Sequence, residues 1–236
     1  MPPVWSDFAA ALAQSPWLPG STSQLVARHV LWALVLGAGV QWFTARIRLG
    51  PALRRAGVLL VLLWALLPGA WSPTFWLGMA FQAPSLLSAG LGLGLLWRGR
   101  LGLQSGAAQP VPTAAAVLGR RLALAGVLLG WLLLLDMLAL LPDGLPVYRW
   151  GFGTPALLLV LLPCAGLARR APGGAEGLAA TPLSWVVLAL VAYTVLRWPT
   201  GNLWDALLDP LLWLALHVGL LRTALRRWRG RGAYPV

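Results

Sequence analysis

The stretch LALAGVLLGWLLLLDMLALLPDG, residues 122–144, decides the fold class of this chain. From its start to Pro142 it carries a single charged side chain, Asp136. A helix of about 20 apolar residues is long enough to cross the hydrocarbon core of a bilayer. A carboxylate inside such a helix costs roughly 2.5–3.5 kcal/mol unless it finds a polar partner. The stretch therefore predicts a membrane-spanning helix and gives Asp136 a structural or functional role.

The whole chain has the composition of a membrane protein. Of its 236 residues, 59% are hydrophobic and only 10% are charged, and the mean hydropathy is +0.76. A soluble domain has about a quarter charged residues and has no core large enough to hide this much apolar surface. We therefore predict an all-α, polytopic transmembrane helical bundle in a bacterial inner (plasma) membrane.

Apolar runs bounded by Arg, Pro or Gly predict about seven spans. Fifteen of the 18 basic residues, all of them arginine, then fall on one side of the membrane, and only Arg28, Arg149 and Arg197 fall on the other. Because cytoplasmic loops are enriched in Arg and Lys, this bias predicts that the N-terminus is outside and the C-terminus is cytoplasmic. The predicted spans are residues 25–44, 56–72, 75–97, 121–142, 153–168, 182–198 and 203–222.

The chain is predicted to have one transmembrane domain between two terminal segments. Residues 1–24 are expected to form a periplasmic interfacial segment, residues 25–222 the seven-helix domain, and residues 223–236 a basic cytoplasmic tail. An arginine near the membrane surface gains about 1 kcal/mol from anionic lipid, so we expect the C-terminal arginines to contact lipid headgroups. These are Arg222, Arg226, Arg227, Arg229 and Arg231.

Tryptophans lie at or near most of the predicted span ends. Trp42, Trp71, Trp76 and Trp204 are examples. Tryptophan is enriched at membrane–water interfaces, where its ring tolerates the headgroup region and its N–H group reaches water. This pattern is typical of an interfacial aromatic belt.

The polar residues predicted to lie inside the membrane share its outer leaflet and form one candidate cluster. In a structural interpretation, Asp136 pairs with Arg149 or Arg197, and Asp205 or Asp209 caps a helix. In a second interpretation the cluster lines an outward-facing cavity for a lipid headgroup, a lipid-linked molecule or a small solute. In a third, Asp136 carries protons or cations. The candidate residues are Asp136, Gln82, His29, Arg149, Arg197, Asp205 and Asp209.

Proline and small residues predict how the helices bend and pack. Pro84 is expected to bend the third span, and Ser85 and Ser88 to bond either to local backbone or to a neighbouring helix. Glycines four residues apart let helices approach closely, either within the chain or against another subunit. These glycines are Gly90, Gly94, Gly126 and Gly130.

Two segments of the chain resemble each other. Residues 54–78 and 120–151 both run from an arginine pair through AGVLL and ALLP to a proline followed by an aromatic residue. In each, the proline closes one helix and the aromatic residue begins the return. The pattern indicates two helical hairpins, with or without a duplication, and Asp136 lies in extra length found only in the second.

The sequence predicts neither a cofactor nor a catalytic motif. There is no lysine, no metal-binding motif and no nucleophile–base pattern. His29 and His217 are predicted near opposite membrane surfaces, which argues against a haem b held between them. The arginines are expected to anchor the chain in the membrane rather than to bind nucleic acid.

These patterns favour a non-catalytic inner-membrane subunit or assembly partner of a larger envelope complex. Its expected partners are membrane lipids and other membrane protein subunits. The alternative is a small transporter or a lipid- or solute-binding membrane protein that uses a polar cavity around Asp136. An intramembrane enzyme is a third possibility.

Overall fold

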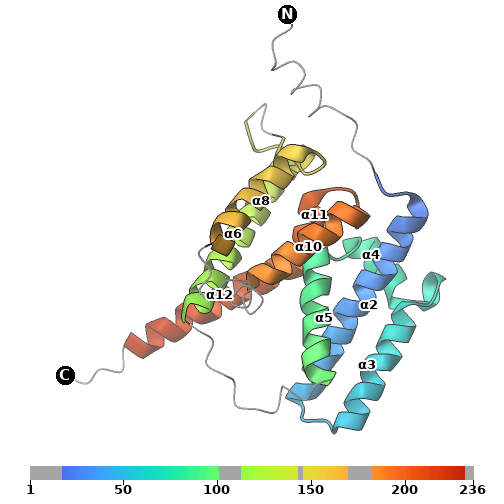
Figure 1. Ribbon diagram of the computed structural model, residues 1–236. Helices are drawn as coiled ribbons and strands as arrows, with labels where there is room; N and C mark the ends of the chain where they lie inside the picture. The colour runs from blue at the N-terminus through green and yellow to red at the C-terminus, as the bar shows by residue number, and fades with distance from the viewer. Residues whose placement is uncertain (1–17, 101–112, 143–145, 170–181, 232–236) are drawn as a thin grey trace, which may run out of the picture.

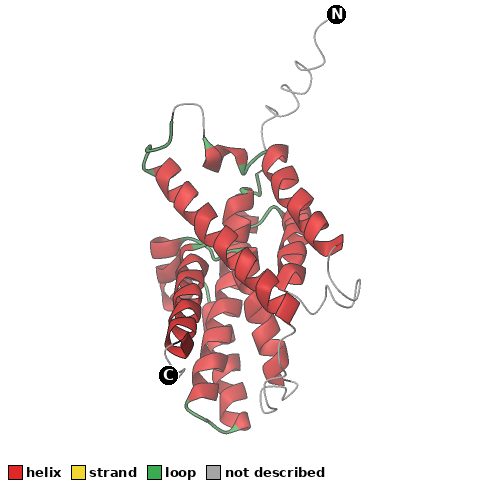
Figure 2. Ribbon diagram, turned by 90° about the vertical axis from the view of Figure 1, so that its left-hand side faces the viewer, coloured by secondary structure: helices red, strands yellow, loops and turns green. Residues whose placement is uncertain are grey.

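The computed structural model describes residues 18–100, 113–142, 146–169 and 182–231. Within these ranges the regular elements are helices and no strand is formed, so the predicted all-α fold class is confirmed (Figure 2). The elements are α2 (Ser21–Arg46), α3 (Pro51–Ala65), the short 3₁₀ helix η1 (Gly69–Trp71), α4 (Pro73–Phe81), α5 (Leu86–Arg100), α6 (Thr113–Met137), α7 (Val147–Trp150), α8 (Thr154–Arg169), α10 (Pro182–Leu196), α11 (Leu203–Leu207) and α12 (Pro210–Arg231).

Three of the predicted spans are not uninterrupted helices. The span predicted at 56–72 is helical only to Ala65, the end of α3, and is followed by η1. The span predicted at 75–97 is divided between α4 and α5, and the span predicted at 203–222 is divided between α11 and α12. Pro84 and Pro210 explain the breaks in the last two spans, because proline has no backbone N–H and its ring clashes with a preceding helical turn. At the α4–α5 break Gln82 also adopts a left-handed φ of 60°, which ends α4.

Two of the described helices are long and apolar enough to cross a membrane. They are α2 and the part of α6 from Ala116 to Met137. Helix α10 and residues Ala156–Arg169 of α8 are apolar but shorter. Seven continuous membrane-length helices are therefore not observed among the residues that the structure describes.

The helices pack as two connected groups. Helix α2 packs against α3 and α5, whereas α10 contacts α5, α6, α8 and α11, and α12 packs on α6 (Figure 1). Trp204 is buried between these helices at 2% exposure and donates from Nε1 to the carbonyl oxygen of Val147 at 2.8 Å. Its assignment to the interfacial belt is therefore wrong. Trp42 and Trp71 are exposed, as an interfacial position requires.

The four glycines predicted to pack helices lie against side chains of other helices. A Cβ atom added at Gly94 would lie 2.5 Å from a ring carbon of Trp185, closer than non-bonded carbon atoms approach. The glycines therefore allow α5 to approach α10 and α6 to approach α12 within the chain. Gly90 and Gly94 face Trp185 of α10, Gly126 faces Leu216 of α12, and Gly130 faces Trp213 of α12.

Helices replace parts of both predicted terminal segments. Helix α2 begins at Ser21, inside the segment predicted at 1–24, and residues 1–17 lie outside the described residues. Helix α12 continues to Arg231, through most of the predicted tail. The start of α2 lies at the upper end of Figure 1, and the end of α12 lies at the lower left.

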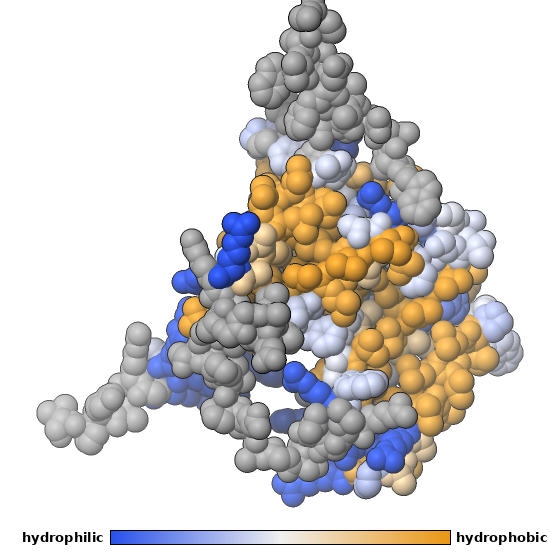
Figure 3. Space-filling view, in the orientation of Figure 1, coloured by the Kyte–Doolittle hydropathy of each residue, from blue (hydrophilic) through white to orange (hydrophobic). Residues whose placement is uncertain are grey.

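Apolar side chains cover much of the surface. They lie over the centre and the right-hand side of the described surface in Figure 3, and many of the hydrophilic residues lie towards its lower edge. On α3, Leu60 and Leu63 are 68% and 65% exposed; on α8, Leu159 and Leu162 are 62% and 70% exposed. Soluble monomers rarely expose apolar patches of this kind, which mark contact with membrane or protein.

Candidate functional site

The two helix breaks meet at the side chain of Asp209, which is buried at 7% exposure. Its Oδ2 atom accepts hydrogen bonds from the Ser85 N–H at 2.9 Å, the Ser85 hydroxyl at 2.7 Å and the Ser88 hydroxyl. Its Oδ1 atom accepts from the N–H groups of Leu211 and Leu212 at 3.0 and 2.9 Å. Asp209 is therefore the N-cap of α12 and also ties α12 to the start of α5. We call Ser85, Ser88 and Asp209 the helix-break junction.

The helix-break junction satisfies the groups that the two breaks leave unpaired. A carboxylate offers about four acceptor positions, and the five donors around Asp209 occupy them all. At the same break, the carbonyl oxygen of Gln82 accepts from Nε1 of Trp32 at 2.8 Å, while the Gln82 side chain is exposed. As folded, the junction joins two helices and offers no free acceptor to a cation.

The other two aspartates in the described residues meet at Tyr148. The Asp136 carboxylate, at the end of α6, accepts from the Tyr148 N–H at 2.6 Å. The Asp205 carboxylate, in α11, accepts from the Tyr148 hydroxyl at 2.9 Å and from the Thr200 hydroxyl at 2.6 Å. Burial, together with the charge of Asp205, raises the pKa of the Tyr148 hydroxyl, so it remains a donor. We call Asp136, Tyr148, Thr200 and Asp205 the Tyr148 network.

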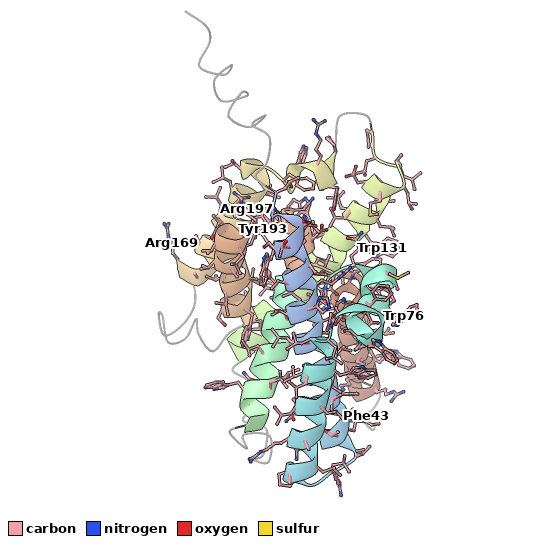
Figure 4. The ribbon with its side chains drawn as sticks, turned by 90° about the vertical axis from the view of Figure 1, so that its right-hand side faces the viewer. Phe43, Trp76, Trp131, Arg169, Tyr193 and Arg197 are labelled. Carbon is pink, nitrogen blue, oxygen red and sulfur yellow. The ribbon has the colours of Figure 1, made fainter. Side chains whose placement is uncertain are left out.

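A second layer of hydrogen bonds surrounds the Tyr148 network. Asn202 is fully buried and donates from Nδ2 to the Tyr148 carbonyl oxygen at 3.0 Å. The Tyr193 hydroxyl donates to the Gly201 carbonyl oxygen at 2.8 Å and accepts from Nη1 of Arg197 at 3.1 Å. Figure 4 shows Arg197 beside Tyr193, where its guanidinium also lies 5.1 Å from the centre of the tyrosine ring. These contacts fix the turn between α10 and α11 against α7.

The expected pairing of Asp136 with an arginine is wrong. Asp136 forms no ion pair with Arg149 or Arg197, all three of which the structure describes. Arg149 is exposed, and Arg197 binds Tyr193. Instead, the Tyr148 N–H, in the first turn of α7, donates to Asp136. This backbone group is a fixed donor at the positive end of a helical turn, so the carboxylate needs no flexible cation.

The predicted outer cluster is therefore divided rather than continuous. Asp136 and Asp205 belong to the Tyr148 network, with Arg197 nearby, and Asp209 belongs to the helix-break junction beside the backbone of Gln82. His29 belongs to neither, because its Nδ1 atom faces the Leu25 carbonyl oxygen of its own helix at 3.0 Å. The hydroxyls of Tyr148, Thr200 and Tyr193 were not among the predicted residues. The Pro199–Gly201 turn beside them is the local signal for a polar reversal.

His217 lies in an aromatic cluster between α6 and α12. Its Nδ1 atom lies 2.8 Å from the Trp213 carbonyl oxygen, and its Nε2 atom accepts from Nε1 of Trp131 at 3.2 Å. The Trp213 ring packs edge-on against the histidine with centres 4.7 Å apart. Both ring nitrogens of His217 are thus engaged within the protein. In the described part of the chain, no three His, Cys, Asp or Glu residues are grouped as metal ligands.

Two grooves lie where α6 and α12 separate near their basic ends. The first has a volume of 610 Å³ and is lined by residues including Arg120, Arg121, Leu216 and Gly219. The second has a volume of 380 Å³ and is lined by Leu221 and Ala224 of α12, among others. Five residues line both grooves and form a seam between them: Arg120, Leu124, Leu220, Thr223 and Arg227.

The C-terminal arginines predicted to contact lipid lie along α12. Arg227 lines both grooves, and Arg222, Arg226 and Arg229 are exposed. Arg231 is the last residue of the helix. A third groove of 470 Å³ has apolar walls that include Trp32, Phe43 and Leu77. None of these three grooves is lined by an aspartate.

No protein-family model, curated protein or solved structure matches this chain.

Proposed function

We propose that the protein is a non-catalytic, multi-pass subunit or assembly partner of a larger complex in a bacterial inner membrane. The observation that carries the proposal is that the three aspartates in the described residues bond to groups of the protein itself. Asp136 accepts from a backbone N–H group, Asp205 from two hydroxyl groups, and Asp209 from both kinds of donor, all of them within the chain itself. Their role is to hold interrupted helices together in a medium without water. Nothing in that role requires a substrate.

The proposed topology has seven crossings with the N-terminus outside. Two crossings are composite: α4 with α5, and α11 with α12. Discontinuous helices are tolerated in membranes where the freed backbone groups are buried in protein, as they are around Asp209. The bias of fifteen of the 18 arginines to one side under this topology supports an odd number of crossings.

Cysteine labelling tests this topology. Cys164 is the only cysteine, so a Cys164→Ala background permits single cysteines at Thr22 and Arg229, which are both exposed. An impermeant maleimide should label the Thr22→Cys variant in intact spheroplasts and the Arg229→Cys variant only after permeabilisation. Labelling of both positions from one side would overturn the odd number of crossings.

The proposed role as a subunit is supported by the apolar faces of α3 and α8, which are exposed in the described part of the chain. Leu60 and Leu63 lie on the first face, and Leu159 and Leu162 on the second. The test is purification of the chromosomally tagged protein in a mild detergent, followed by native mass spectrometry. A stoichiometric membrane protein should co-purify, and Leu60→Arg or Leu162→Arg should release it. A matched Met79→Arg variant, at an exposed residue of α4, should retain it. A homogeneous monomer carrying only lipid would refute the role.

A small transporter is the second candidate, and one observation favours it. The α4–α5 and α11–α12 breaks meet at a buried carboxylate, and transporters bind substrates and coupling ions at discontinuous helices. Proteoliposomes containing a pH-sensitive dye would report proton movement coupled to added solutes. Transport abolished by Asp209→Asn, in a variant shown to be folded, would favour this candidate over the first.

A further inference from the structure

The paired grooves between α6 and α12 combine charge and apolar surface in a way that the Tyr148 network and the helix-break junction do not. The two helices touch where Gly126 faces Leu216 and where Gly130 faces Trp213. They part towards the N-terminal end of α6 and the C-terminal end of α12, which leaves open space on both sides of the seam. The grooves are therefore built by the divergence of two packed helices.

The seam places positive charge at one end of an apolar surface. Arg120 and Arg227 line both grooves, and Arg121 lines the first. Away from them the walls are apolar, with Leu124, Leu216 and others on the two helices. No acidic residue lines either groove. This polarity matches a molecule with an anionic head and a hydrocarbon body.

The geometry points to a binding site for one anionic phospholipid of the surrounding bilayer. Its phosphate lies at the seam between Arg120 and Arg227, where guanidinium groups form charge-assisted hydrogen bonds to phosphate oxygens. One acyl chain follows the larger groove towards Leu216, and the other begins in the smaller groove beside Leu221. Basic pockets between helices on the cytoplasmic side of a membrane are a known setting for acidic lipid headgroups.

This inference requires the chain to lie in a membrane but not to be a subunit of a complex. Under the proposed topology, the arginines of the seam are on the cytoplasmic side, and the bound lipid belongs to the inner leaflet. The lipid fills the space that α6 and α12 leave between them. It therefore acts as a wedge that fixes the angle between the two helices.

Native mass spectrometry of the full chain in detergent, with added dioleoylphosphatidylglycerol or dioleoylphosphatidylcholine, tests the site. The wild type should retain one phosphatidylglycerol in preference to phosphatidylcholine. An Arg120→Gln/Arg227→Gln double variant should bind phosphatidylglycerol about thirtyfold more weakly, since each arginine near the surface contributes about a fivefold factor. The matched control is Arg222→Gln/Arg229→Gln, which removes the same charge from α12 outside the grooves.

A second variant tests the groove separately from the charge. Gly219 lines the larger groove, and a Cβ atom added there meets nothing within 4 Å, so the side chain of a Gly219→Leu variant begins in open space in the groove. It should reduce phosphatidylglycerol binding although every arginine remains. Inorganic phosphate at the lipid's concentration should not displace the lipid, because it lacks the acyl chains.

Three results would overturn the site: equal retention of the two lipids, an equal loss in the control variant, or no effect of Gly219→Leu. Equal retention would mean that the grooves do not select charge. An equal loss in the control would mean that the whole basic surface, not the seam, attracts the lipid. An inert Gly219→Leu variant would place the acyl chains elsewhere. None of these results would alter whether a protein partner co-purifies.

Discussion

Replacing Asp209 tests whether the helix-break junction holds the fold together. The carboxylate accepts three hydrogen bonds from Ser85 and Ser88 on one side and two from Leu211 and Leu212 on the other. Asp209→Ala removes all five. Asp209→Asn keeps one oxygen, which can still cap α12, because asparagine is as good an N-cap as aspartate. The two variants therefore separate the helix cap from the link between helices.

The expected magnitudes follow from the number of bonds. Hydrogen bonds between helices in a membrane protein average about 0.6 kcal/mol, because the unfolded state in the membrane also finds partners. The three bonds from Ser85 and Ser88 then contribute roughly 2 kcal/mol, and loss of an N-cap costs about 1 kcal/mol more. We expect Asp209→Ala to lower the free energy of unfolding by about 3 kcal/mol and Asp209→Asn by about 2 kcal/mol.

Equilibrium unfolding in mixed micelles of dodecyl maltoside and SDS, followed by tryptophan fluorescence, would measure these changes. Ser88→Ala should cost about 0.6 kcal/mol alone and less in the Asp209→Asn background, since its acceptor is already lost. The matched control is Thr194→Ala, which removes a hydroxyl bonded only within its own helix. The reasoning would be refuted if Asp209→Ala cost less than about 1 kcal/mol or if Ser88→Ala and Asp209→Asn were strictly additive.

Three further predictions use the same unfolding measurement. Asp136→Leu should lower the free energy of unfolding by about 1 kcal/mol more than Asp136→Asn does, because leucine leaves the Tyr148 N–H without an acceptor. Asp136→Asn should show no energetic coupling to Arg149→Gln or Arg197→Gln. A coupling above roughly 0.5 kcal/mol would indicate that Asp136 does form an ion pair with that arginine. Gly94→Leu should lower the free energy of unfolding by about 1–3 kcal/mol, because the new side chain meets Trp185. Gly39 has open space around it, so Gly39→Ala should change that free energy by no more than about 0.5 kcal/mol. Equal effects of the two substitutions would contradict the packing of α5 on α10. Tyr148→Phe should cost roughly 0.6–1 kcal/mol, since Asp205 keeps only its bond from Thr200, and an unchanged stability would remove Tyr148 from the network.

The features that the sequence predicted correctly depend on local chemistry. An apolar composition with short loops predicts helices, and the helices lie where the apolar runs lie. A cap at Asp209 follows from an acidic residue just before a proline, because that proline begins a helix well and the carboxylate reaches its first N–H groups. The packing role of Gly94 and Gly130 follows from their lack of a side chain.

The features that the sequence did not predict depend on distant contacts. Pro84 predicted a bend, but a full break at Gln82 needs Asp209, 127 residues further along the sequence, to accept the freed groups of Ser85. Likewise, the charge of Asp136 suggested an arginine partner, whereas the chain reversal supplied a backbone N–H. Charge complementarity can be read from residue types, but the position of an unpaired backbone group exists only in the folded chain.

Unpaired backbone N–H groups also explain why the charged side chains at the helix interruptions are acidic rather than basic. The first turn of a helix leaves N–H groups without partners, and a bilayer offers them no water. A carboxylate satisfies several donors at once, whereas an arginine, which has only donors, adds to the deficit. Two of the three aspartates in the described residues accept such N–H groups: Asp209 at the start of α12 and Asp136 beside the start of α7. Asp205, in the first turn of α11, accepts instead from the hydroxyls of Tyr148 and Thr200. The acid at residue 136 is therefore placed by the geometry of the chain reversal, and an asparagine, which keeps an acceptor oxygen, is the substitution that this position should tolerate best.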